Sequence, residues 1–106
     1  MNEDRIKQLL TFRLENPDDP FIIYALATEF KENDPLKAKK YYDLLLSEFP
    51  EYIGTYYHAA ALYADHFDRV QAEKIYLKGI QIAQQLNEAH ALKELNNAYL
   101  NFQFED

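Results

Sequence analysis

The sequence contains no cysteine, and this absence excludes several kinds of site at once. Disulfide bonds, thiolate nucleophiles, cysteine-ligated zinc and iron–sulfur clusters all need a cysteine sulfur. Glycine is almost as scarce, with two residues in 106, and there are only four prolines. Long loops and all-β folds with many tight turns use more of both residues. The composition therefore favours helices joined by short connections.

Long apolar runs and an excess of basic residues are also missing. Although 48% of the residues are hydrophobic, no apolar run reaches the roughly 18 to 20 residues that a membrane-spanning helix needs. The first five residues lack the basic and apolar regions of a secretory signal. Eighteen acidic residues against eleven basic ones give a formal net charge of −7, which repels phosphate backbones and anionic lipids. We therefore expect a cytoplasmic protein that binds neither nucleic acid nor membranes.

One helical pattern is present twice between residues 20 and 82. The first half of the pattern recurs at a constant offset, in the pairs Tyr24/Tyr57, Leu26/Ala59, Ala27/Ala60 and Phe30/Tyr63. The second half recurs at an offset that is longer by one, in the pairs Ala38/Ala72, Tyr42/Tyr76 and Leu46/Ile80. A period in the mid-thirties with two helices per unit indicates a stacked array of helical hairpins.

Apolar spacing and capping residues predict six helices, over about residues 3–15, 20–32, 35–48, 52–66, 69–85 and 88–102. Aspartate-proline pairs at 19–20 and 34–35 start two of them, because aspartate accepts backbone N–H bonds and proline is tolerated at the first helical position. Asp68 and Asn87 are predicted to cap the last two helices.

The same spacing predicts the buried face of each helix. These residues are Ile6, Leu9, Leu10, Phe12, Ile23, Leu26, Ala27, Phe30, Leu36, Ala38, Tyr42, Leu45, Leu46, Tyr56, Ala59, Ala60, Tyr63, Val70, Ala72, Ile75, Tyr76, Gly79, Ile80, Ala83, Leu92, Leu95, Ala98, Tyr99 and Phe102.

The first and last helices fit the repeat as halves. Pro17 precedes Pro50 by the offset found in the first half of the pattern, so the first helix matches the second helix of a repeat. The last helix matches the first helix of the second repeat at a slightly longer offset. The alignments pair Leu9 with Tyr42, Phe12 with Leu45, Leu95 with Ala59, and Tyr99 with Tyr63. We expect an all-α fold, a six-helix antiparallel hairpin array with two full repeats and a capping half-repeat at each end. The expected single domain, 1–106, divides into a capping helix 1–17, repeats 20–50 and 51–85, and a capping helix 87–103.

At these positions the chain resembles the tetratricopeptide repeat, in the form of a small bacterial-type stand-alone module. The family's small residues correspond to Ala27 with Ala38 and Ala60 with Ala72, its large packing residues to Leu26, Phe30, Tyr42, Ala59, Tyr63 and Tyr76, and its closing proline to Pro50. Two departures are Ile23 and Tyr56 at the usual tryptophan position, and Gln84 in place of a second closing proline.

The resemblance implies a right-handed superhelix whose concave wall, formed by the first helix of each pair, binds a peptide or partner helix. Carried over residue by residue, that wall comprises Phe21, Tyr24, Thr28, Lys31, Tyr57, Ala61, Asp65, His90, Lys93 and Asn97. Tyr24 and Tyr57 either anchor the ligand or pack against neighbouring helices. The expected function is a non-catalytic scaffold for a protein or peptide partner. A carboxylate clamp is not expected, because only Lys31 and Lys93 place positive charge on the wall.

Two other kinds of function stay open. One alternative is a self-associating structural module, in which Phe102 and Phe104 would make a two-fold contact between copies. Another is an accessory subunit of a larger complex. An enzyme is the weakest class, because no serine elbow, glycine-rich phosphate loop or paired-carboxylate signature is present. His58 and His66 are eight residues apart, not the four that bring two imidazoles to one metal ion. We therefore expect no catalytic residue, cofactor or metal.

Overall fold

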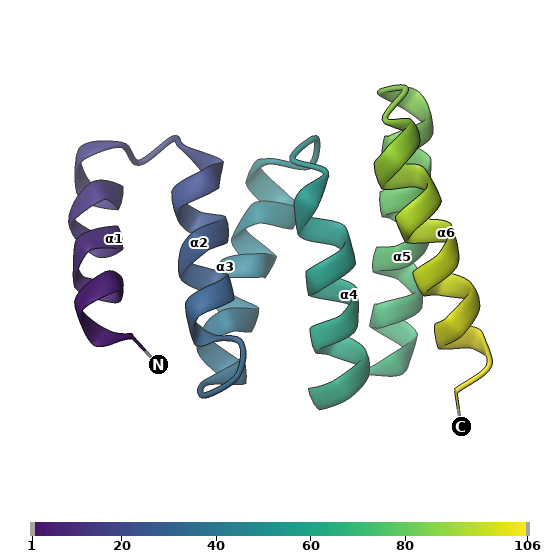
Figure 1. The fold of residues 1–106 in the computed structure, drawn as a ribbon, viewed down its shortest axis with the longest axis horizontal. Helices are drawn as coiled ribbons and strands as arrows, with labels where there is room; N and C mark the ends of the chain where they lie inside the picture. Colours follow the sequence, from purple (N-terminus) through teal and green to yellow (C-terminus); the bar gives the residue numbers. More distant parts are fainter. Residues whose placement is uncertain (1, 106) are drawn as a thin grey trace. The chain divides into compact units, whose positions relative to one another are not determined.

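The computed structural model describes residues 2–105, which form six α-helices (Figure 1). They are α1 (Glu3–Glu15), α2 (Pro20–Phe30), α3 (Pro35–Glu48), α4 (Gly54–His66), α5 (Arg69–Gln85) and α6 (Ala89–Gln103). The predicted bounds agree with these to within two residues at every end. The chain divides into two compact units, an N-terminal unit that ends at Phe49 and a C-terminal unit that begins at Pro50.

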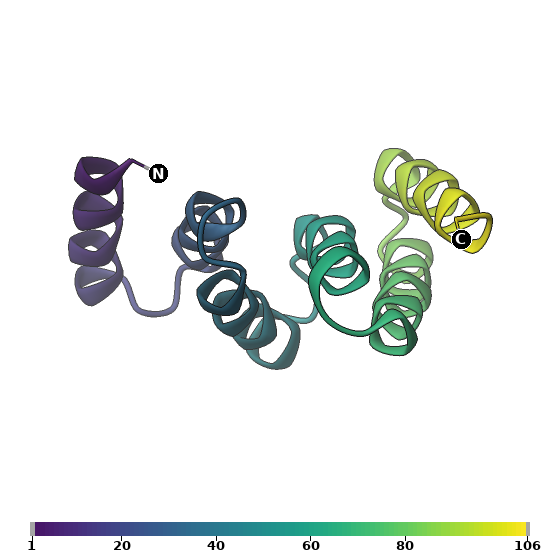
Figure 2. The ribbon, with the colours of Figure 1, turned by 90° about the horizontal axis from the view of Figure 1, so that it is seen from below.

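The N-terminal unit is the α2–α3 hairpin with α1 packed on α2 (Figure 2). Where the two hairpin helices pack, Ala27 and Ala38 are both fully buried, and so is the larger Tyr42. Small side chains at both alanine positions let the backbones approach closely, as the repeat pattern predicts. The α1 helix adds Ile6 and Leu9 to this core.

The C-terminal unit is the α4–α5 hairpin, with α6 packed against both of its helices. Ala60 and Ala72 are fully buried, as their counterparts in the first hairpin are. Gly79 on α5 faces Tyr56 on α4: a Cβ atom added at Gly79 would lie 2.6 Å from the Tyr56 Cβ. Only glycine therefore permits this distance between the two helices.

Three of the four predicted helix caps are confirmed. The carboxylates of Asp19, Asp34 and Asp68 accept bonds from backbone N–H groups in the first turns of α2, α3 and α5, at 3.0, 3.2 and 2.9 Å. The prediction for Asn87 is wrong, because Glu88 is the N-cap residue of α6. Asn87 instead has a φ of 57°, and the N–H groups of Asn87 and Glu88 bond to the carbonyls of Gln84 and Ala83. Asparagine tolerates this left-handed conformation, which closes the end of α5.

Four residues predicted to be buried are exposed: Leu10, Phe12, Leu36 and Val70. Leu36 and Val70, in the first turns of α3 and α5, are 71% and 64% exposed, because no neighbouring side chain covers most of either one. Leu10 and Phe12 lie on α1, which packs on a single helix, so that only the stripe containing Ile6 and Leu9 is covered. Several other predicted core residues are half-buried, namely Leu46, Tyr63, Ile75, Ile80, Leu92, Ala98 and Tyr99.

Candidate functional site

In the N-terminal unit the predicted site residues form one stripe along α2. The Asp19 carboxylate caps this helix and Pro20 occupies its first turn, which fixes where the stripe begins. Phe21, Tyr24, Thr28 and Lys31 follow at intervals of three or four residues, the spacing that places side chains on one helix face. None of these four is buried, whereas the residues between them include the fully buried Leu26 and Ala27.

The stripe on α2 is tied to the core through Thr28. Its Oγ1 donates to the backbone carbonyl of Tyr24 at 3.0 Å and lies 3.5 Å from the hydroxyl oxygen of Tyr42 on α3. Burial raises the pKa of Tyr24 and of Tyr42, and hydrogen bonding to Thr28 offsets part of the rise for each. Both phenols are therefore neutral at physiological pH, so that a half-buried Tyr24 presents an aromatic ring with a polar tip.

In the C-terminal unit α4 carries the second stripe, formed by Tyr57, Ala61 and Asp65. The Tyr57 ring is 44% exposed and meets the His58 ring edge-on, with 5.3 Å between the ring centroids. Burial raises the pKa of Tyr76 on α5, and the nearby Tyr57 and Asp65 raise it further, as does Glu105, against a lowering by Arg69. The stripe on α4 thus lies within electrostatic reach of the second hairpin's core.

The third stripe, on α6, consists of the exposed residues His90, Lys93 and Asn97. The Nε2 atom of His90 lies 3.3 Å from the Glu94 Oε1, an ion pair only when the histidine is protonated. This stripe is more polar than the one on α4, which begins with an aromatic ring.

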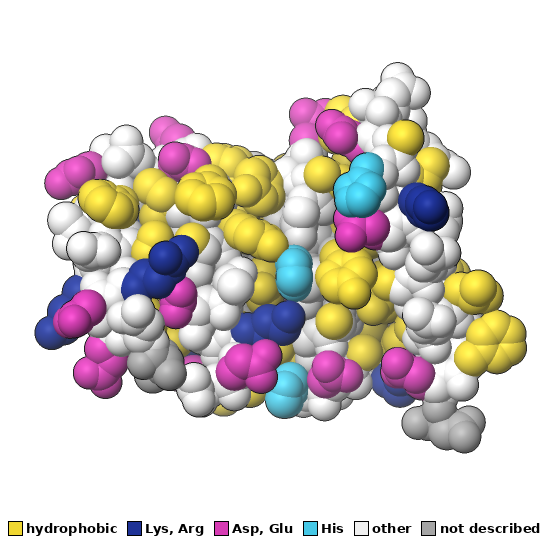
Figure 3. Space-filling model, in the orientation of Figure 1, with side chains coloured by type: hydrophobic (Ala, Val, Ile, Leu, Met, Phe, Trp, Pro, Cys, Tyr) yellow, Lys and Arg dark blue, Asp and Glu magenta, His cyan; other side chains and the backbone are white. Residues whose placement is uncertain are grey.

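Side-chain types differ between the stripes in Figure 3 as well. Hydrophobic side chains gather over the first turns of α2, and charged side chains lie over its later turns. Over α4 and α6 the visible face mixes histidine, acidic and hydrophobic side chains. The structure thus places four of the ten predicted residues in the N-terminal unit and six in the C-terminal unit, all of them on the surface or half-buried.

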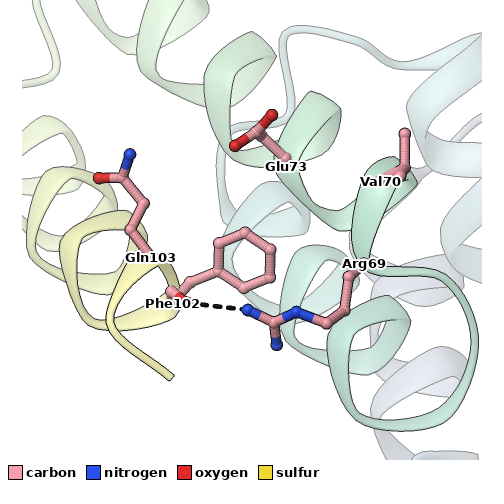
Figure 4. A pocket seen from close by; sticks show the side chains of 5 residues that line it. All are labelled: Arg69, Val70, Glu73, Phe102 and Gln103. Carbon is pink, nitrogen blue, oxygen red and sulfur yellow. Dashed lines mark hydrogen bonds between the residues drawn. The ribbon is translucent and has the colours of Figure 1, made fainter. Parts of the chain in front are cut away.

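Sequence reasoning missed a cleft of about 380 Å³ between α5 and α6 (Figure 4). The Arg69 guanidinium lies 4.2 Å from the centroid of the Phe102 ring and donates from Nη2 to the Phe102 carbonyl at 2.9 Å. Its Nη1 also lies 3.7 Å from a carboxylate oxygen of Glu105. These contacts of Arg69 fasten the end of α6 to α5. Phe102 is buried in the process, so the predicted two-fold contact through Phe102 and Phe104 is wrong for Phe102.

A second missed feature is a pocket of about 330 Å³ on the N-terminal unit, lined by Leu10, Arg13, Leu14 and Pro17. The Arg13 guanidinium lies 5.8 Å from the ring centroid of Tyr41 on α3. Sequence periodicity assigned Leu10 to the core, which concealed this pocket.

Within residues 2–105 no three histidine, aspartate or glutamate side chains gather closely enough to hold a metal ion. None of the helices in that range is both long and apolar enough to cross a membrane.

Two solved structures are similar to this chain over most of its length. Both are of a tetratricopeptide repeat domain protein from Salinibacter ruber. The solution NMR structure is 35% identical in sequence, with a TM-score of 0.78, over 85% of this chain and 93% of that one. The crystal structure is 34% identical, with a TM-score of 0.75, over 81% of this chain and 98% of that one. No family model matches the sequence, and no curated protein does.

Proposed function

Because this chain belongs to the tetratricopeptide repeat family, we propose that it is a non-catalytic scaffold that binds a peptide or helix of a partner protein. Domains of this family are generally protein-interaction modules. We assign the partner to the stripe on α2 in the N-terminal unit and to the stripes on α4 and α6 in the C-terminal unit. The binding residues are then Phe21, Tyr24, Thr28, Lys31, Tyr57, Ala61, Asp65, His90, Lys93 and Asn97.

The observation that carries this proposal is the contrast between Tyr56 and Tyr57. Tyr56 is 1% exposed and holds the hairpin together, whereas Tyr57, the next residue, is 44% exposed. Phe21 on α2 is more exposed still, at 58%. Packing inside the units therefore does not account for either ring. Exposed aromatic rings are enriched where protein interfaces gain most of their free energy.

The charges on the three stripes set the kind of partner. Lys31 on α2 and Lys93 on α6 are cationic, and Asp65 on α4 is anionic. A partner segment with apolar side chains and charges of both signs fits these surfaces better than a uniformly acidic one. Its apolar groups would supply affinity, and its charges would fix register and orientation.

Selection of short random peptides on the purified chain, followed by calorimetry, tests the proposal. We expect Tyr24→Ala and Tyr57→Ala each to weaken the selected peptide's binding by at least about tenfold, as loss of an interface anchor does. Circular dichroism should show unchanged helicity for Tyr57→Ala, because this ring lies largely outside the core.

Leu36→Ala and Phe104→Ala are matched controls, since both side chains are exposed and lie outside the three stripes. They should bind the peptide as the unaltered chain does. Equal affinity for both tyrosine variants and the unaltered chain would contradict the proposal, and so would an equal loss in the controls.

A further inference from the structure

The two half-repeats are complementary in kind. The α1 helix aligns with the second helix of a repeat and packs on α2, while α6 aligns with a first helix and packs on α4 and α5. In each complete repeat a first and a second helix pack together as a hairpin, α2 with α3 and α4 with α5. Each copy of the chain therefore carries, in α1 and α6, the two halves of one further hairpin.

Phe12 marks the open face of α1. It aligns with Leu45 on α3 and, one repeat further on, with Gly79 on α5. Leu45 is fully buried, whereas Phe12 is 48% exposed. A Cβ at Gly79 would touch Tyr56 of α4, so this position points at the first helix of its own repeat. Phe12 thus lies on the face that a first helix covers in the two complete repeats.

The corresponding open face of α6 contains Leu92 and Asn96. Leu92 aligns with Tyr56, and Asn96 with Ala60, in the register that pairs Leu95 with Ala59. Tyr56 and Ala60 are buried against α5, but Leu92 is only half-buried and Asn96 is exposed. The missing cover is a second helix, which is the type that α1 represents.

We propose that α6 of one copy packs against α1 of the next copy and completes a repeat head to tail. If the two helices pair as α4 and α5 do, Phe12 contacts Leu92 of the neighbouring copy, because Phe12 aligns with Gly79 and Leu92 aligns with Tyr56. Arg5, which aligns with Ala38, then faces Asn96. Its Nε already lies 2.6 Å from a Glu29 carboxylate oxygen, and the guanidinium has further N–H donors for the amide oxygen of Asn96.

This contact is independent of the three stripes, so it goes beyond the proposed function. Such a contact joins unlike surfaces, so it links copies either into an open chain or into a closed ring. One helix pair buries less than about 1,200 Å², the size of weak interfaces, and an arginine and an asparagine replace the two close-packed alanines. Association is therefore expected at protein concentrations of about 0.1 to 1 mM.

Sedimentation equilibrium with two blocking variants tests the proposal. Phe12→Asp places a charge on the open face of α1, and Asn96→Arg sets a second cation against Arg5. The unaltered chain should exceed monomer mass as concentration rises, and each variant alone should stay at 12.6 kDa. An equimolar mixture of the two should form a dimer and stop there, because one intact α6 meets one intact α1.

Two matched controls separate this contact from general surface effects. Leu14→Asp alters α1 at a position that aligns with the exposed Ser47, and Asn101→Arg alters α6 at an exposed residue five positions after Asn96. Both controls should associate as the unaltered chain does. Melting temperatures of all four variants show whether each is folded.

A strengthening variant covers the case in which a blocking variant unfolds. Asn96→Glu sets a carboxylate against Arg5 and should tighten association about two- to fivefold, the effect of one exposed ion pair. A chain that stays monomeric to about 1 mM, with and without this change, overturns the proposal. Association of either blocking variant alone at the unaltered strength also overturns it, because that result indicates a two-fold contact between like ends.

Discussion

The two hairpins share one sequence pattern, but at one packing position the second helix has a large side chain in the first hairpin and none in the second. In α2–α3 the position is filled by Leu45, and its counterpart in α4–α5 is Gly79, both buried. The first helices compensate, with Ile23 in one hairpin and the larger Tyr56 in the other. In the second hairpin the larger side chain lies on the first helix and not on the second, and the alignment of the two helices is unchanged. The larger Tyr56 thus occupies part of the space that the missing side chain at Gly79 leaves open.

Alanine at this one position should be harmful in both hairpins, for opposite reasons. Leu45→Ala leaves a cavity and should lower the free energy of unfolding by about 2–5 kcal/mol. Gly79→Ala forces a methyl group against Tyr56 and should cost about 1–3 kcal/mol, despite alanine's better helix propensity. Urea denaturation measures both values. A stabilised Gly79→Ala chain would show that the α4–α5 spacing is not set by the absence of a side chain.

A second difference between the hairpins, Thr55 in place of Ile22, should have a smaller effect on the free energy of unfolding. Thr55, one repeat after Ile22, is fully buried, and its Oγ1 has no hydrogen-bond partner in the described residues. Thr55→Val removes this unpaired hydroxyl and keeps the shape, so it should stabilise the chain by about 1 kcal/mol. Thr28→Val is the matched control, because the Thr28 hydroxyl is bonded to Tyr24 and its removal should not stabilise. Equal responses of the two threonines to valine would contradict this account.

The smallest expected effect concerns pH and the paired residues Tyr42 and Tyr76. Burial raises the pKa of both phenols above their usual value of 10.0. The neutral form is then favoured in the folded chain, so this stability is fully present below pH 10 and declines as pH rises through the folded-state pKa. Between pH 8 and about 10.5, Tyr42→Phe should reduce the loss of stability by under about 1 kcal/mol. Denaturant titrations at both pH values check this, and a loss unchanged by the substitution would assign the pH dependence to other groups.

Sequence periodicity predicted the six helices and the alanine contacts because those depend on spacing within about 35 residues. Sequence periodicity gave wrong predictions of burial where burial depends on which other helices lie beside the residue. Phe12 has core chemistry at a core position, yet it is exposed because no first helix precedes α1 in the described chain. Leu36 is likewise exposed, because no neighbouring element covers this side chain in the described residues.

The candidate site divides in the same way. Helical spacing places Phe21, Tyr24 and Tyr57 on surface stripes, which local geometry suffices to predict. The contact of Arg69 with Phe102 joins residues 33 positions apart on helices that are not one hairpin. No local sequence pattern predicts this contact, because it depends on how α6 packs against α5.

The most direct test of the central claim is a titration of the isotopically labelled chain with a selected peptide, followed by two-dimensional NMR. We expect the largest amide shift changes along the α2 stripe from Phe21 to Lys31 and on α4 around Tyr57, with smaller ones on α6. Changes confined to α1, α3 and α5 would contradict the assignment of the first helices as the binding surface.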